Sequence, residues 1–202
     1  MEGLPGFGNV GKITAELLIS FSKAKPFAEY YSPFFPDYVN IDNNGICTPP
    51  RYEFYASTEH KPNVVILTGD SHPPLNNVVA HYEICEEILD FTQKLGTNLV
   101  VTIGGVPVSS DKGDVYVAAT SRKLAAKIMD QGAIIYGKGR IMGATGLLLG
   151  LAKERGLDSI CLLGATDGMG SDKEAGSGVF QLLLKVLGLK SSGDMHQKRG
   201  KG

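Results

Sequence analysis

The sequence contains no tryptophan, only three cysteines and no excess of charge of either sign. Its 20 Lys and Arg residues nearly balance its 21 Asp and Glu residues, whereas nucleic-acid-binding proteins usually carry a basic excess or patch. The one basic cluster lies among glycines at the end of the chain, in residues 198–201. The charge pattern therefore argues against nucleic acid as a partner.

The cysteines are Cys47, Cys85 and Cys161, and their odd number and wide spacing do not form a disulfide framework. Each has apolar neighbours, which predicts buried free thiols in a reducing compartment. No basic segment followed by an apolar run begins the chain, and we expect no signal peptide. The longest apolar stretch, around 146–152, is far shorter than the ~20 residues that span a bilayer. We expect a cytoplasmic protein that does not contact membranes.

The chain length of 202 residues and an apolar share of 43% predict one domain with its own core. No linker composition divides the chain. We predict a single α/β domain over residues 1–190 and a flexible C-terminal tail over 191–202.

The first third of the chain combines one helix with a β-rich stretch. Residues 12–22 place Ile13, Leu17, Leu18 and Phe21 on one helical face, and Asn9 is suited to cap this helix. Extended segments are predicted at 27–31 and 52–56. Between them, Asn-Gly at 44–45 separates two short apolar runs, which predicts a β-hairpin.

The rest of the chain alternates strands with helices. The predicted strands are 63–67, 98–103, 133–136 and 159–163. The predicted helices are 76–95, 121–130, 144–154 and one that opens with a capping box at Ser171 and ends at Gly188. Helix 144–154 has almost no polar face, which predicts burial in a core or an interface. The pattern indicates a three-layer α/β/α sandwich with a mainly parallel mixed sheet plus an antiparallel hairpin.

Loops at the carboxyl ends of the predicted strands are the expected binding region, since partners and ligands of open α/β sheets bind there. These loops follow Leu67, Ile103 and Leu163. The loop residues that we predict to bind a partner or ligand are Asp70, Ser71, Gly104, Gly105 and Thr166, together with Pro5 and Phe7 of the opening loop and Arg140 of a glycine-rich loop.

The opening loop also matches two phosphate-binding patterns. Residues 6–11 read G-x-G-x-x-G, and extension to Lys12 gives most of a P-loop. On that interpretation the cofactor-binding residues are Gly6, Gly8, Asn9, Gly11 and Lys12. However, Ile13 stands where a P-loop has Ser or Thr, no strand precedes the loop, and Pro5 stiffens it. A tight turn that packs a helix onto a sheet and a protein-binding loop are the other two readings.

Catalytic and metal sites have little support in the sequence. His81 and Cys85 have the i, i+4 spacing of a zinc pair, but no second pair at metal spacing accompanies them. No Gly-x-Ser-x-Gly element of the hydrolase type is present. We therefore predict no catalytic residues, no metal and no cofactor, and a binding protein is favoured over an enzyme.

Seven segments, in this order along the chain, resemble the archaeal branch of the proteasome-assembly-chaperone family. They are EGLPGFGNVGK at 2–12, YSPFFP at 31–36, PPRYEFY at 49–55, LTGDS at 67–71, IGG at 103–105, GATGLLLG at 143–150 and CLLG at 161–164. Together they cover residues 1–190.

The resemblance implies a fold related to nucleoside phosphorylases and a non-enzymatic, homo-oligomeric factor that assists the assembly of 20S proteasome α-subunits. It also leaves open a nucleotide- or phosphate-binding enzyme, ATP-grasp-like or phosphorylase-like, that uses the Gly6–Lys12 loop. The chain departs from the family twice. Residues 200–202 are Gly-Lys-Gly in place of a hydrophobic-Tyr-any docking end, and no strand precedes the Gly-Leu-Pro-Gly loop. A missing central strand would expose a sheet edge that invites pairing with another chain.

Overall fold

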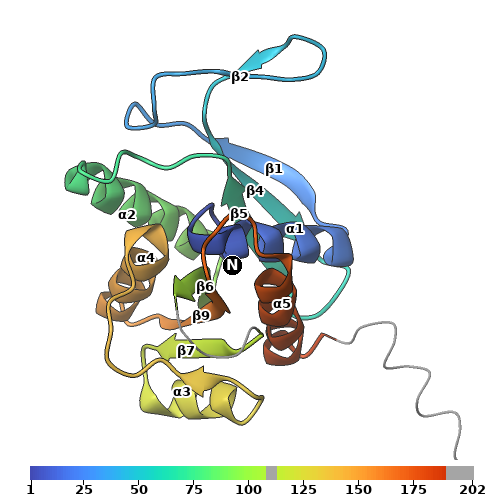
Figure 1. Ribbon diagram of the computed structural model, residues 1–202, viewed down its shortest axis with the longest axis vertical. Helices are drawn as coiled ribbons and strands as arrows, with labels where there is room; N and C mark the ends of the chain where they lie inside the picture. The colour runs from blue at the N-terminus through green and yellow to red at the C-terminus, as the bar shows by residue number, and fades with distance from the viewer. Residues whose placement is uncertain (108–112, 190–202) are drawn as a thin grey trace, which may run out of the picture.

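The computed structural model describes residues 1–107 and 113–189 (Figure 1). The helices are α1 Val10–Ser22, α2 Val78–Lys94, α3 Arg122–Met129, α4 Gly143–Glu154 and α5 Lys173–Leu187, and a 3-10 turn, η1, covers Phe7–Asn9. The strands are β1 Lys25–Tyr30, β2 Asn40–Ile41, β3 Cys47–Thr48, β4 Tyr52–Ser57, β5 Val64–Gly69, β6 Leu99–Pro107, β7 Val115–Ala119, β8 Ile134–Ile135 and β9 Asp158–Thr166. The predicted α/β class is confirmed.

The main sheet consists of two groups of strands. One group has the antiparallel order β1-β4-β5, and the other has the order β6-β9-β7-β8. β6 runs parallel to β9, while β7 runs antiparallel to β9, so the sheet is mixed. The two groups are joined through Glu2, which forms parallel bridges to Leu67 of β5 and to Thr102 of β6.

Helices cover the sheet on both faces. On one face α1 packs against α5, and their buried residues share a core with Ile66, Ile103 and Ile160 of the strands. On the other face α2 packs against α4 over Phe54, Leu67 and Val100. The predicted three layers are therefore present among the described residues, with β2 and β3 forming a small arm outside them (Figure 1).

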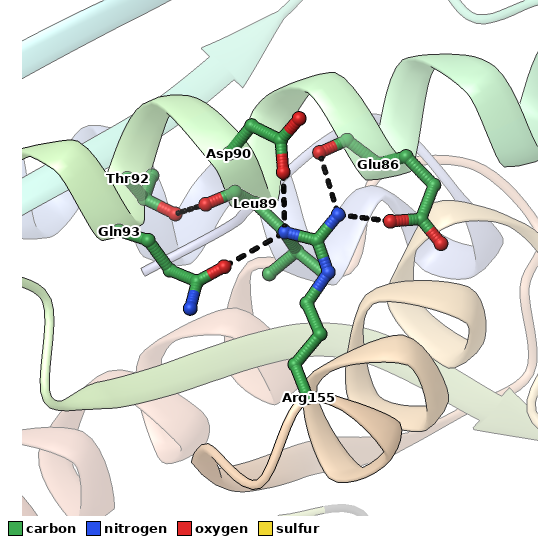
Figure 2. Close-up of polar contacts among 6 residues, drawn as sticks. All are labelled: Glu86, Leu89, Asp90, Thr92, Gln93 and Arg155. Atoms are coloured by element: carbon green, nitrogen blue, oxygen red, sulfur yellow. Dashed lines mark hydrogen bonds and ion pairs between the residues drawn. The ribbon is translucent and has the colours of Figure 1, made fainter.

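Arg155, directly after α4, ties that helix to α2 (Figure 2). Its guanidinium contacts the carboxylate of Glu86 and lies 2.7 Å from an oxygen of Asp90. It also donates a hydrogen bond of 2.8 Å to the side-chain oxygen of Gln93. Since these partners lie on consecutive turns of α2, one cation fixes the end of α4 along that helix.

Helix α4 is less buried than its composition predicts. Only Leu148 and Ala152 of α4 are fully buried, and its other apolar residues are partly exposed. The sheet and α2 cover only one stripe of α4, so within this chain the expected burial in a core holds for that stripe alone. The remaining stripe is partly open to solvent.

Strand β7 was not predicted, although Val115 and Val117 alternate inward as in a half-buried strand. Its position between β9 and β8 depends on an antiparallel pairing with β9 that has no local signal. Cys47 is also a correction: it is exposed on β3, whereas Cys85 and Cys161 are buried as predicted.

Two predicted helix caps differ from the structure. Asn9 precedes α1 in a left-handed conformation and its side chain makes no capping hydrogen bond. Asp172, not Ser171, caps α5, because its carboxylate accepts from the N–H of Ala175 at 3.0 Å. The predicted tail over 191–202 lies outside the described residues.

The core beneath α5 yields a stability prediction. Leu183 is fully buried between α5 and the sheet, so Leu183→Ala should lower the free energy of unfolding by about 2–5 kcal/mol through lost burial and a residual cavity. Lys185→Ala, on the exposed face of the same helix, is the matched control and should change it by less than about 0.5 kcal/mol. Urea unfolding measures both, and equal effects would contradict this packing.

Candidate functional site

The carboxyl ends of β5, β6 and β9 lie at one edge of the sheet. Glu2 pairs in parallel with both β5 and β6, and β6 pairs in parallel with β9, so the three strands run in the same direction. The prediction that the loops after Leu67, Ile103 and Leu163 share an edge is confirmed.

Glycines pack the opening loop tightly onto this edge. A Cβ on Gly105 would overlap with the carbonyl oxygen of Phe7 and lie 2.9 Å from Cγ2 of Thr166. A Cβ on Gly8 would lie 2.6 Å from the hydroxyl oxygen of Thr166, and one on Gly11 would lie 2.7 Å from the carbonyl oxygen of Ile103. The opening loop is therefore a close-packed turn that seats α1 on β6 and β9.

Hydrogen bonds join the opening loop to the loop between β9 and α5. The N–H of Asp172 donates to the carbonyl oxygen of Gly8 at 2.8 Å. The Thr166 hydroxyl donates to the carboxylate of Asp172 at 2.8 Å, and the Asn9 amide donates to the Ser171 hydroxyl at 3.4 Å. Asp172 thus caps α5 and also holds both loops together.

Three large apolar side chains project from this edge, and we call them the apolar edge: Phe7, Met142 and Met169. They are 42%, 85% and 90% exposed, respectively. The ring of Phe7 occupies the space beside Gly168, where a Cβ would overlap with it. Met142 directly precedes α4, and Thr145 in the first turn of α4 lies against Gly104 of β6. Phe7 instead lies against the neighbouring Gly105.

The other residues predicted for the site have separate positions. Pro5 is half-buried, Ser71 is buried, and the exposed Asp70 accepts a hydrogen bond of 2.5 Å from Asn40 of β2. Arg140 is exposed in the loop before α4. The structure therefore brings Phe7, Gly104, Gly105 and Thr166 together. Sequence reasoning missed Met142 and Met169, although each stands beside a glycine in a predicted loop.

Lys12 lines a hollow that is separate from the place where the glycines of the opening loop pack on the sheet. This hollow, with a volume of about 410 Å³, lies between α1 and strands β4 and β5 and is also lined by Arg51 and Asp70. Arg51 already forms ion pairs with Glu29 at 3.1 Å and Glu53 at 2.9 Å. Lys12 therefore faces the hollow, whereas Gly8 and Gly11 of the same P-loop-like pattern pack against Thr166 and Ile103.

Glu2 is a buried carboxyl group at the junction of the two strand groups. It is 3% exposed, and its Oε1 accepts hydrogen bonds from the N–H of Leu4 at 3.1 Å and from the Thr145 hydroxyl at 3.5 Å. Burial raises the pKa of Glu2 to about 7, against the opposing effect of the Leu4 N–H. Burial likewise lowers the pKa of the Met1 ammonium to about 6. The sequence carried no signal that this acid is buried, since it lies outside any predicted element.

Within residues 1–107 and 113–189, the acidic, histidine and cysteine side chains are dispersed. No group of three His, Cys, Asp or Glu side chains is placed there to hold a metal ion. Cys85 lies in the core under α2, where burial raises the pKa of its thiol to about 12. None of the described helices has the length and apolar character needed to cross a membrane.

A mixed α/β domain with a glycine-packed loop edge is the class that this geometry defines. The model of the PAC2 family matches residues 1–196, and the chain belongs to this family. The uncharacterized protein MJ1210 of Methanocaldococcus jannaschii is 34% identical over 205 residues, which cover 100% of this chain and 78% of that protein.

Solved structures agree with this membership. PbaB of Pyrococcus furiosus, described as an archaeal proteasome activator, is 37% identical with a TM-score of 0.88, covering 98% of this chain and 86% of that one. PbaA of the same organism, described as an archaeal homolog of proteasome-assembly chaperone, is 30% identical with a TM-score of 0.80, covering 98% and 83%. The resemblance found in the sequence is confirmed at the level of the family.

Close packing at the edge predicts that an alanine substitution destabilises the protein at Gly105 but not at Gly6. Gly105→Ala should lower the free energy of unfolding by about 1–3 kcal/mol, because the new methyl group forces the Phe7 backbone away. Gly6→Ala should have little effect, since no atom lies within 4 Å of the added Cβ and its φ of −174° suits any residue. Thermal unfolding compares the two variants, and equal losses would contradict the described packing.

Titration of Glu2 predicts a loss of stability on raising the pH. Because the folded-state pKa is about 7 against an ordinary 4.5, the stabilisation is complete below pH 4.5 and is lost as pH rises to 7. The loss amounts to about 3 kcal/mol. The Met1 ammonium acts oppositely, since its lowered pKa gives stability that is present above pH 8 and lost as pH falls through 6.

Glu2→Gln removes the pH-dependent contribution of the Glu2 carboxyl group to stability and keeps the shape of the side chain. Urea unfolding from pH 4.5 to 7 should show a decline for the parent protein that is absent in this variant. Glu16→Gln, an exposed acid on α1, is the control and should keep the decline. Parallel curves for the parent and Glu2→Gln would contradict a buried, protonated Glu2.

Proposed function

We propose that this chain is a non-enzymatic, proteasome-associated protein-binding factor, and more narrowly that it assists the assembly of 20S proteasome α-subunits in the cytoplasm. The observation that carries the proposal is the apolar edge, where Phe7, Met142 and Met169 project from loops packed closely on glycine. Exposed aromatic and methionine side chains are enriched in protein interfaces. A rigid base favours binding because less conformational freedom is lost when a partner docks.

Two relatives in the family support a proteasome-associated role. PbaB and PbaA are described as a proteasome activator and a homolog of a proteasome-assembly chaperone, respectively. Their sequence identities of 37% and 30% to this chain support more than a shared fold. We extend the proposal to a homo-oligomer that presents several copies of the apolar edge, which would let weak contacts add up through multivalency.

The phosphate-binding alternative receives less support from the geometry. Gly8 and Gly11 are packed against Thr166 and Ile103, so their backbone faces are occupied by protein. Gly6 has open space beside it, but Lys12 lies on the hollow with Arg51.

Removal of the apolar edge should weaken binding of proteasome α-subunits. Phe7→Ala combined with Met169→Ala should reduce capture of purified α-subunits at least about tenfold, because each exposed side chain loses its buried contact with the partner. Met129→Ala is the matched control, since Met129 is 42% exposed like Phe7 but ends α3 away from this edge. Light scattering should show whether each variant keeps the oligomeric size of the parent. Equal capture by both variants would count against the apolar edge, and no capture by the parent would overturn the proposed partner.

Nucleotides should not stabilise the protein. A ligand at 100 times its dissociation constant raises the free energy of unfolding by ~2.7 kcal/mol, which a thermal shift assay detects easily. We expect no shift with ATP, NAD, nucleosides or inorganic phosphate. A shift that Lys12→Ala abolishes and Lys23→Ala retains would support the enzyme alternative instead.

A further inference from the structure

The outer side of α2 is apolar at the start of the helix. Leu75, Val78, Val79 and Tyr82 follow one another at helical spacing, and they are between 47% and 80% exposed. A stripe with this spacing on a soluble protein normally faces a core, whereas this one faces solvent. Contiguous apolar side chains of this kind mark protein–protein contact surfaces.

The outer side of α2 becomes acidic along its next turns. The helix carries four acids against Lys94, which gives it a net charge of −3 at neutral pH. Arg155 neutralises only part of this charge, and the two acids that it does not contact remain exposed. The four acids are Glu83, Glu86, Glu87 and Asp90. We call this acidic and apolar surface the α2 face.

A basic surface lies on α3 and β8. Residues 120–140 carry five Lys and Arg residues against Asp130 alone, a net charge of +4 in a chain whose total is −1. Because β7 and β8 are parallel, α3 runs back between them, and its start lies at the same end as the residues that follow β8. All five cations are exposed, and within the described part of the chain none has an ion-pair partner. They are Arg122, Lys123, Lys127, Lys138 and Arg140.

Strand β8 adds an apolar part to this basic surface. It is the last strand of the group β6-β9-β7-β8, so its outer edge has no paired strand among the described residues. Ile134 and Ile135 are consequently 41% and 46% exposed. We call the combined basic and apolar surface the α3–β8 face.

The two faces lie at opposite ends of the main sheet. α2 packs over the end formed by β1 and β4, where Phe91 contacts Phe27 and Phe54. β8 is the strand at the other end, and Figure 1 shows α3 beside it, far from α2. One chain cannot join its own two faces, but a second copy can bring acidic residues to basic ones and apolar residues to apolar ones. Apolar contacts then supply the centre of an interface, and complementary charges align the two copies.

We propose that copies of this chain associate head to tail, with the α2 face of one copy on the α3–β8 face of the next. The contact joins unlike surfaces, so each added copy leaves one face of each kind free until a ring closes. The inference rests on the homo-oligomeric part of the proposed function, for which it names the interface, and it does not depend on a proteasome partner.

The test blocks one face at a time in the full chain and measures size by sedimentation velocity. The parent should sediment as an assembly of several copies. Val79→Asp places a charge within the apolar stripe, and Lys123→Glu combined with Lys127→Glu sets acids against the acids of α2. Each blocked protein should sediment as a single chain. A parent that is itself a single chain would overturn the proposal.

Matched controls carry the same changes of charge elsewhere. Ile41→Asp, at a side chain that is 61% exposed on β2, is the control for the α2 face. Lys153→Glu combined with Lys185→Glu, on the exposed sides of α4 and α5, is the control for the α3–β8 face. Both controls should keep the parent assembly. Dissociation by the controls but not by the blocked variants would place the interface elsewhere and overturn the proposal.

An equimolar mixture of the two blocked proteins separates a head-to-tail contact from a symmetric one. The Val79→Asp chain keeps its α3–β8 face, and the doubly substituted chain keeps its α2 face. The mixture should therefore form pairs with one chain of each kind and nothing larger, which also shows that both variants are folded. A mixture that contains only single chains would overturn the proposal. Size is read separately from capture of α-subunits, so the interface can fail while the proposed function stands.

Discussion

The hydrogen bonds of Met1–Gly3 to two strands are the interaction on which the rest of the fold depends. β5 and β6 belong to different groups of strands, and Glu2 joins them in parallel through Leu67 and Thr102. Because these bridges set the direction of β5 relative to β6 and β9, they also decide that three carboxyl ends meet at one edge. The side chain of Glu2 reaches Thr145, so the same residue positions the first turn of α4.

The loop edge illustrates how small residues create a surface for large ones. Gly8 and Gly105 allow the opening loop to approach Thr166 closely, and Asp172 fastens it through the carbonyl oxygen of Gly8. Phe7 is consequently held with its ring beside Gly168 and half in solvent. An exposed aromatic side chain on a closely packed loop is suited to contact a protein partner, since little entropy is lost on binding.

Buried charge at the strand junction opposes stability at neutral pH. Burial raises the pKa of Glu2, and the Leu4 N–H and the Thr145 hydroxyl, which both donate to its carboxyl group, offset this only in part. The same burial disfavours the charged form of the Met1 amine. Charges in a low-dielectric interior are costly, so burial outweighs the attraction between the Glu2 carboxylate and the Met1 ammonium.

Local patterning in the sequence was sufficient for the α/β class, for most helices and strands, and for the common edge of the loops after Leu67, Ile103 and Leu163. These features depend on periodicity and turn residues that act over a few positions. Strand β7, the half-exposed α4, the exposed Cys47 and the Asp172 cap depended on tertiary structure, because each is decided by which neighbour packs against it. The burial of Glu2 is the clearest case. A glutamate at the start of a chain reads as solvated, and only its pairing with both β5 and β6 places its carboxyl group inside the protein.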